Sequence, residues 1–449
     1  MNEQAKGIFG LDHRLKGTRG NLLLLLAGLT LINVLFYGIY AVKLLFPAVF
    51  FYHPLEGFSG LFCDFYNPVR YAYYLRPIDN VWSNAPPFLH FFCYLVSLVL
   101  RLFTPEKGGL AMAYTPAGQI GFALLALGML VGISWGIARF AKPHLQCAER
   151  CWLCAMTVAS YPFFFGLASG NMVLLVSTLI VLFLLCYEQK RYTWAAIWLG
   201  IAAALKLYPA LLGVLFLYDK RWKEGLLCAA VGIGLTLVSL AAFQGGIIPN
   251  LLDFLEKTES YHLYGNLDLR RIMMNNNSLL MLWDIPIYMA RGSLISLEEM
   301  AAHNAAMSAV LAGLLALSVA SCFFLRRKQD MALLMCLWMV GYPYNSEPYN
   351  LTIIAVALVY WACREKTRRI PMMAMGVLLL MCKTRTAFYA TNVRHITMQS
   401  VLNPALILGM ILYLYALRHK EIFEDMKKAA AGIRKMFSRK DIPAGTENR

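Results

Sequence analysis

The sequence is a succession of apolar runs, several of them long enough to cross a lipid bilayer, separated by short segments rich in Lys and Arg. Hydrophobic residues make up 59% of the chain and charged residues only 15%, whereas a soluble domain carries about 25% charged residues. So little polar surface cannot cover a body that faces water. Because lipid leaves every backbone polar group to be satisfied within the protein, the runs predict helices. The chain is therefore expected to be an all-α polytopic membrane protein, not a disordered, collagen-like, coiled-coil or secreted disulfide-rich one.

The charge distribution predicts the orientation. Lys and Arg exceed Asp and Glu by 41 − 25 = 16, and they cluster at the ends of apolar runs, as the positive-inside rule requires. This explanation is preferred to nucleic-acid binding, which we do not expect. It places residues 1–20 and the basic tail 418–449 in the cytoplasm, with one transmembrane domain over 21–417. The tail has enough positive charge to touch anionic lipid headgroups.

Two cytoplasmic ends require an even number of crossings. The run Phe88–Phe103 is short, begins at Pro86-Pro87 and contains Arg101, so we expect it to lie at the outer interface, within a first external loop over 48–103. About 12 crossings remain, several of them short. They lie in eleven apolar runs, of which Thr193–Tyr218 is interpreted as two half-helices: Asn21–Phe50, Gln119–Ala138, Leu153–Phe165, Met172–Tyr187, Thr193–Tyr218, Leu226–Phe243, Ala305–Leu325, Met331–Gly341, Leu351–Cys363, Met372–Met381 and Pro404–Leu417.

The run Thr193–Tyr218 has basic residues at both ends, which a single crossing cannot satisfy. Pro209 breaks a helix close to Lys206. We interpret the run as two half-helices that meet at Lys206, an arrangement that membranes accept only where it lines a cavity or packs against protein. The alternative is one span with Glu188–Arg191 outside.

Metal binding has one candidate cluster, formed by His144, Cys147, Cys151 and Cys154. The segment from Cys147 onward is expected to be a continuous helix, and one straight helix cannot place four ligands around zinc. We therefore predict no metal site and no cofactor, although the sequence leaves the use of a divalent cation open.

Polar residues concentrate in the predicted external loops, which favours an enzyme working at the outer face over a transporter with ionisable residues at the midplane. In the first of these loops Asp64 lies among aromatic residues, close to Arg70. A carboxylate so placed is suited to act as a general base toward a sugar hydroxyl. The alternative role, a turn-capping Asp paired with Arg70, is equally compatible with the sequence.

Several segments resemble the membrane glycosyltransferases of the GT-C superfamily, and glycosyltransferase family 87 most of all. They are the early loop Asp with its Tyr-rich sequence and Pro86-Pro87, the pair Gly170-Asn171, the stretch from Gly200 to Lys206-Leu-Tyr-Pro209, the basic-Trp-basic tract after Asp219, and Asn275–Ser278. The resemblance extends over about 20–420. It implies a GT-C fold.

The resemblance also implies a reaction: inverting transfer of a hexose, typically mannose, from a polyprenyl-phosphate carrier to an acceptor hydroxyl on a glycan or glycolipid, with Asp64 as general base. The departing phosphate needs cations, and the candidates are Lys206, Arg70, Arg270, Arg271, Lys383, Arg385 and Arg394. Lys206 is the leading one, because a Lys between apolar half-helices is costly unless an anion meets it; a snorkelling Lys at the interface is the alternative.

Candidates for sugar or acceptor contacts are polar residues of the external loops: Asn171, Asn276, Asn277, Ser278, Glu347, Tyr349 and His395. Each has a structural alternative, such as a helix cap for the Asn-Ser run or an ordinary turn for Glu347. The chain departs from the family pattern in having Asn171 after Gly170 where Gly-Gln is usual, and in lacking a late His-containing loop, which bears on the acceptor and the sugar. Competing functions are transfer of another sugar or to a protein acceptor, and a flippase or small-molecule transporter.

Overall fold

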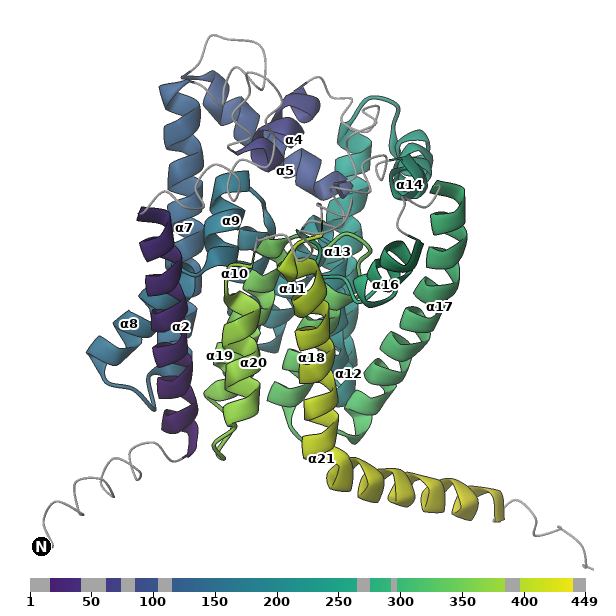
Figure 1. The fold of residues 1–449 in the computed structure, drawn as a ribbon. Coiled ribbons are helices and arrows are strands. Elements are labelled where there is room, and N and C mark those ends of the chain that lie inside the picture. Colours follow the sequence, from purple (N-terminus) through teal and green to yellow (C-terminus); the bar gives the residue numbers. More distant parts are fainter. Residues whose placement is uncertain are drawn as a thin grey trace, which may run out of the picture.

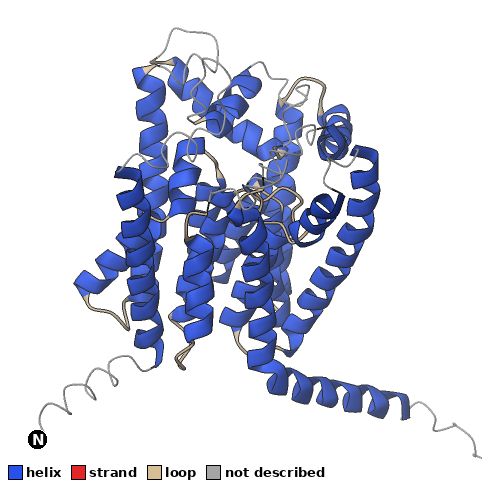
Figure 2. Cartoon of the chain, in the orientation of Figure 1, coloured by secondary structure: helices blue, strands red, loops and turns tan. Residues whose placement is uncertain are grey.

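The computed structural model describes residues 17–41, 62–73, 85–103, 115–264, 275–291, 297–383 and 396–438. Within these ranges every regular element is a helix (Figure 2). In chain order they are α2 (Gly17–Ala41), α4 (Cys63–Tyr73), α5 (Pro87–Arg101), α7 (Pro116–Ala141), α8 (Cys147–Val158), α9 (Tyr161–Ser169), α10 (Val173–Glu188), α11 (Tyr192–Leu205), η2 (Tyr208–Gly213), α12 (Val214–Tyr218), α13 (Trp222–Ala242), α14 (Ile247–Tyr264), α16 (Met281–Arg291), α17 (Leu297–Ser321), η3 (Cys322–Phe324), α18 (Lys328–Gly341), η4 (Pro348–Asn350), α19 (Leu351–Ala362), α20 (Ile370–Leu380) and α21 (Met398–Ser438).

The membrane class predicted from composition is confirmed. Among the described residues, five helices are long and apolar enough to cross a bilayer: α2, α7, α13, α17 and α21. The pair α8 and α9 adds a sixth if it counts as one bent span. The predicted continuous run Leu153–Phe165 is wrong in this respect, because Pro162 at the start of α9 interrupts the helix and the two parts meet at 53°.

The apolar helices divide into a core and a shell. Nearly every residue of α10, α18 and α19 is buried, whereas α7, α13 and α17 are equally apolar but leave large side chains such as Leu124, Ile233 and Leu317 exposed. A helix that is apolar all round is either buried or faces lipid. Figure 1 shows this arrangement, with α18 and α19 inside the bundle and α7 and α17 along its sides.

The basic segments gather at one end of the bundle, where acidic residues pair with them. Arg19 pairs with Glu149 at 2.7 Å, Arg364 with Glu188 at 2.5 Å, and Lys328 with Asp219 at 2.5 Å. These pairs join the ends of six different helices. The expectation that the basic segments share one side is therefore met, and we call this the basic end.

A buried ion-pair network lies at the same end. Arg418 on α21 donates hydrogen bonds to Asp330 at 2.7 Å and to Glu365 at 2.5 Å, and these three side chains are at most 3% exposed. The indole of Trp361 on α19 also donates to Asp330, at 2.6 Å. The network fixes α21 against α18, α19 and the segment that precedes α20.

The opposite end of the bundle carries the shorter helices. In Figure 1, α4 and α5 lie obliquely across this end, and α14 lies beside them. α5 begins at Pro87 and has 15 residues, and its place at the outer interface stays a prediction. The segment 244–303, which lies between the predicted crossings Leu226–Phe243 and Ala305–Leu325, holds α14, α16 and the start of α17. We call this end the loop end.

Candidate functional site

Asp64 lies in the first turn of α4, at the loop end. The chain enters α4 through Phe62, which has a left-handed backbone (φ 60°) that is unusual for a residue with a side chain. The backbone N–H of Phe62 donates to the carbonyl oxygen of Ala168 at 2.8 Å. The start of α4, and Asp64 with it, is thereby fixed to the end of α9.

The turn between α9 and α10 provides the hydrogen-bond partner of Asp64. The side-chain amide of Asn171 donates to Oδ2 of Asp64 at 2.9 Å. Its carbonyl oxygen accepts from the backbone N–H of Val173 at 3.0 Å, which caps the start of α10. Asn171 is therefore held from both sides, and it orients the carboxylate. This pairing joins two residues that are 107 positions apart.

Gly170 makes this contact possible. Its φ is +74°, and a Cβ atom there would lie 2.9 Å from Cα of Phe62 and 3.0 Å from Cβ of Phe65. Only Gly allows both the left-handed turn and the close approach of α4.

We predict that Gly170→Ala separates Asn171 from Asp64. The left-handed backbone costs an Ala about 1–2 kcal/mol, and the contact with Phe62 must also open. Transfer activity should fall at least about tenfold, and the apparent melting temperature in detergent should decrease. Gly213→Ala is the control, because a Cβ atom at Gly213 meets nothing within 4 Å; equal effects of the two substitutions would contradict the prediction.

Lys206 lies at the predicted helix break, which the structure confirms. α11 ends at Leu205, Lys206 is extended (φ −151°, ψ 128°), and Pro209 lies in the first turn of η2. Proline suits this place because the first residues of a helix have no internal acceptor for their N–H groups. The charges of Asp64 and Glu347 both act on the Lys206 ammonium group. The break thus brings a cation within electrostatic range of two carboxylates from distant parts of the chain.

His90 is a neighbour of Lys206 that the sequence interpretation missed. It is 1% exposed, on the fourth residue of α5. Burial, with a smaller contribution from the charge of Lys206, lowers the pKa of His90 to about 3, so the imidazole is neutral near pH 7. The available signal was a His one turn after Pro86-Pro87, on a helix that was regarded only as an interfacial element.

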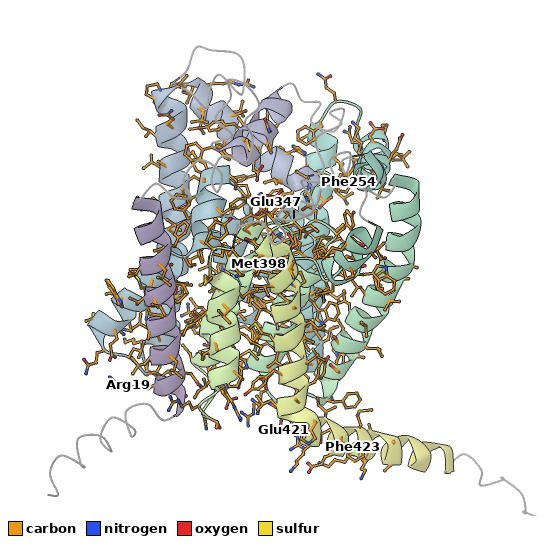
Figure 3. All side chains as sticks on the ribbon, in the orientation of Figure 1. Arg19, Phe254, Glu347, Met398, Glu421 and Phe423 are labelled. Carbon is orange, nitrogen blue, oxygen red and sulfur yellow. The ribbon has the colours of Figure 1, made fainter. Side chains whose placement is uncertain are left out.

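Glu347 and Tyr349 flank the site on the loop between α18 and α19; Figure 3 labels Glu347 there. The Tyr349 ring lies 6.0 Å from the ring of Phe165 on α9. The Tyr208 hydroxyl, two residues after Lys206, donates to the side-chain oxygen of Asn350 at 3.4 Å. These contacts hold the loop against both α9 and the Lys206 break, and Tyr208 and Asn350 are further residues that the sequence did not single out.

The Asn276–Ser278 run has internal partners in the structure. The Asn276 amide donates to the carbonyl oxygen of Tyr344 at 2.7 Å, and its side-chain oxygen accepts from the N–H of Ser346 at 2.9 Å. Asn277 donates to the carbonyl oxygen of Ser346 at 2.7 Å, and Ser278 Oγ accepts from the N–H of Leu280 at 3.3 Å. These bonds attach the run to the Glu347 loop and position that loop.

Lys383 follows the end of α20. Its ammonium group donates to the carbonyl oxygens of Leu378, of Leu379 at 3.4 Å, and of Met381 at 2.9 Å. Burial, partly offset by Cys382, lowers its pKa to about 7. A cation at a helix C-terminus satisfies otherwise unpaired carbonyl groups, so in this structure Lys383 caps α20.

The other predicted phosphate and acceptor residues are not described. Arg70 lies on α4, but its side chain is outside the described residues. Arg270, Arg271, Arg385, Arg394 and His395 also lie outside them. Of the predicted set, the structure therefore brings together Asp64, Asn171, Lys206 and Glu347.

Asp284 is a buried carboxylate that the sequence did not indicate. It is 4% exposed on α16, and its Oδ2 atom has no hydrogen-bond partner within the described ranges. Burial raises its pKa to about 7. Since an unfolded Asp titrates near pH 3.9, the folded chain retains a proton that the unfolded chain loses between about pH 4 and pH 7, and Asp284 lowers stability as pH rises through that window.

We therefore predict that Asp284→Asn stabilises the protein at pH 8 but not at pH 4. One pKa unit corresponds to about 1.4 kcal/mol, and the gain at pH 8 should exceed that value. Unfolding in detergent at the two pH values measures it. The exposed Glu256→Gln should differ equally little from wild type at both. A gain that is the same at pH 4 and pH 8 would rule out titration of Asp284 as the cause.

The site unites a carboxylate that an amide orients, a cation and a second carboxylate, and these come from α4, the α9–α10 turn, the α11–η2 break and the loop before η4. Such a set can remove a proton and stabilise an anion. Over the described ranges, no group of three or more His, Cys, Asp or Glu side chains is placed to hold a metal ion.

The comparisons with known proteins give one positive result. The sequence model of glycosyltransferase family 87 matches residues 86–342, which is 257 of 449 residues and more than half of the chain. The match includes Asn171, Lys206 and the Asn276–Ser278 run, and it ends shortly before Glu347. No curated protein matches the sequence.

Proposed function

Because the chain belongs to glycosyltransferase family 87, we propose that this membrane glycosyltransferase moves a hexose, with mannose as the first choice, from a polyprenyl-phosphate carrier to an acceptor hydroxyl. The acceptor is a glycan, a glycolipid or another alcohol. The reaction inverts the anomeric centre and takes place at the loop end, which faces away from the cytoplasm. We assign the chain a GT-C architecture with about 12 crossings.

In the proposed reaction Asp64 accepts the proton of the acceptor hydroxyl while its oxygen attacks the anomeric carbon. The bond from that carbon to the phosphate oxygen breaks, and polyprenyl monophosphate leaves with the bonding electrons. General-base catalysis of this kind contributes about 10²–10⁴-fold. The negative charge that develops on the phosphate is stabilised by a cation already in place, and this role goes to Lys206.

One observation carries the proposal: the Asp64 carboxylate accepts a hydrogen bond from Asn171 and acts electrostatically on Lys206. Asn171 orients the base without neutralising it, since an amide has no charge to contribute. Lys206 is half-buried at a break between apolar segments, where a cation is costly unless an anion offsets it. Asp64 and Glu347 offset it in the free protein, and the phosphate would do so with substrate bound.

The remaining predicted residues have supporting roles in this proposal. Glu347 and Tyr349 contact the acceptor, and Asn276, Asn277 and Ser278 hold their loop in place. Lys383, Arg70, Arg270, Arg271, Arg385 and Arg394 contribute to the positive field around the polyprenyl phosphate, and His395 contacts the acceptor. The reaction uses no metal ion.

The test is transfer by the purified protein in proteoliposomes. Radiolabelled mannosyl, glucosyl and galactosyl polyprenyl phosphates are supplied in turn with a lipid extract as acceptor, and products are identified by mass spectrometry. We expect a labelled product with the mannosyl donor, unchanged by EDTA. A product with another donor alone would correct the sugar. Loss of activity in EDTA and its return with magnesium would overturn metal independence. Movement of intact donor between leaflets without product would indicate a flippase instead.

A further inference from the structure

The last part of α21 leaves the bundle. In Figure 1 the helix descends to the basic end and then turns sharply, so that its last part runs crosswise below the bundle and away from it. Glu421 lies at this elbow and Phe423 just beyond it (Figure 3). We call residues 420–438 the crosswise helix. A helix in this position lies parallel to the plane of the membrane that the bundle spans.

Ion pairs fix the direction of the elbow. Arg418, just before it, is held by Asp330 and Glu365 in the buried network. Just after it, Arg326 pairs with Asp425 at 2.8 Å and with Glu424 at 3.1 Å. Because ion pairs attach both sides of the elbow to the bundle, the packing of the bundle fixes the direction of the crosswise helix.

The crosswise helix has an apolar face that the bundle does not cover. Phe423 is 59% exposed and Met426 is 50% exposed. In the sequence, Met426, Ile433 and Phe437 follow one another at intervals of seven and four, which places these positions on one side of a helix. Ile422, one turn before Met426, packs against the core of the bundle. An apolar stripe of this kind is stable only if it contacts an apolar environment at the depth at which the crosswise helix lies.

The charges beside this stripe are positive. The acidic residues of the first turns are occupied, since Glu424 and Asp425 pair with Arg326, and Arg327 lies 3.8 Å from Glu421. The stretch from Met426 to Lys440 contains six basic residues and no acidic one: Lys427, Lys428, Arg434, Lys435, Arg439 and Lys440. Lys427 Nζ lies 4.4 Å from the centre of the Phe423 ring, so positive charge borders the apolar face directly.

We propose that the crosswise helix binds the anionic phospholipid surface of the membrane leaflet at the basic end. Its apolar stripe enters the boundary between headgroups and acyl chains, as in interfacial amphipathic helices, and its Lys and Arg side chains contact the phosphate groups. An anionic surface is the occupant that suits both features, because basic residues outnumber acidic ones along this segment and its acidic residues already pair within the chain, Asp425 with Arg326 and Lys428, and Glu424 with Arg326. The proposal is independent of the reaction at the loop end.

Hydrogen exchange on the full chain in nanodiscs tests the proposal. Amide exchange of residues 420–431 is compared in discs of phosphatidylglycerol and of phosphatidylcholine. We expect it to be at least about tenfold slower in the anionic discs, and we expect Lys427→Glu with Lys428→Glu to remove the difference. Lys142→Glu with Lys366→Glu is the matched control, since it makes the same charge change on exposed residues outside the helix.

Other outcomes would overturn the proposal. Equal exchange in the two lipids, or loss of the difference in the control double variant as well, would show that the crosswise helix does not recognise anionic lipid. Slow exchange that disappears only when each disc holds a single copy would assign the apolar face to a second copy of the chain. Exchange of α18 and α19 should be the same in every variant, which shows that the bundle is intact.

Discussion

Replacing Asp64 by Asn should reduce sugar transfer about 10³-fold while leaving the protein folded and able to bind its donor. The amide side chain has the same shape, and its oxygen can still accept the hydrogen bond that Asn171 donates at 2.9 Å. It cannot take a proton from an alcohol. Since loss of a general base costs about 10²–10⁴-fold, the effect should appear in kcat and much less in the KM for the donor.

Glu256→Gln is the matched control for this experiment. It makes the same change from carboxylate to amide on α14, also at the loop end, at an exposed residue. Its transfer rate should equal that of wild type. If Asp64→Asn retained more than about a tenth of wild-type kcat, Asp64 would be a structural partner of Asn171, and another group would be the base.

Replacing Arg418 by Gln should destabilise the bundle by about 3–5 kcal/mol, the usual cost of breaking a buried ion pair by removing one partner. The loss leaves Asp330, which is 1% exposed, without its cation, while the buried Glu365 keeps only its contacts with the partly exposed Arg327 at 3.2 Å and Arg369 at 3.8 Å. Neither carboxylate can reach bulk water without opening the contacts among α18, α19 and α21. Unfolding of the detergent-solubilised protein measures the effect, and transfer at low temperature should persist in the fraction that remains folded.

Arg326→Gln is a close control, because Arg326 also joins two carboxylates but its side chain is 44% exposed. Exposed pairs contribute only about 0–1 kcal/mol, so this variant should unfold almost like wild type. Adding Asp330→Asn and Glu365→Gln to Arg418→Gln should restore part of the stability, since no buried charge then remains unpaired. Equal losses for Arg418→Gln and Arg326→Gln would contradict the buried network.

The fold was predictable wherever each segment depends on its own residues. Apolar runs identified most of the bundle helices, and Pro209 correctly located the break at Lys206. Errors arose where the local composition of a segment is compatible with two different structures. The bend before α9 was missed because Pro162 lies inside an apolar run, and α14 was missed because its mixed composition resembles that of a loop. The helix that a cap at Asn276–Ser278 implied is present as α16, which begins at Met281.

The site was predictable only in part, for a related reason. Asp64 and Lys206 are conspicuous in the sequence because each is an ionisable residue next to apolar or aromatic segments. Their partners are not conspicuous. Nothing in the local sequence says that Asn171 reaches Asp64 across 107 positions, or that His90 lies within electrostatic range of Lys206. Lys383 is a further case, because the sequence did not indicate that its ammonium group caps α20.

The sequence by itself determined that the helices of this protein face lipid and that its basic segments lie at one end of the bundle. It also determined the helix break that places a Lys among apolar residues. These follow from transfer energies and backbone constraints that act on each segment separately. Only the tertiary structure decided which carboxylates share Lys206, which amide orients Asp64, and how Arg418 holds α21 at its elbow. Those contacts join residues more than a hundred positions apart, or helices that meet only when the whole bundle packs, and no local property of the chain specifies them.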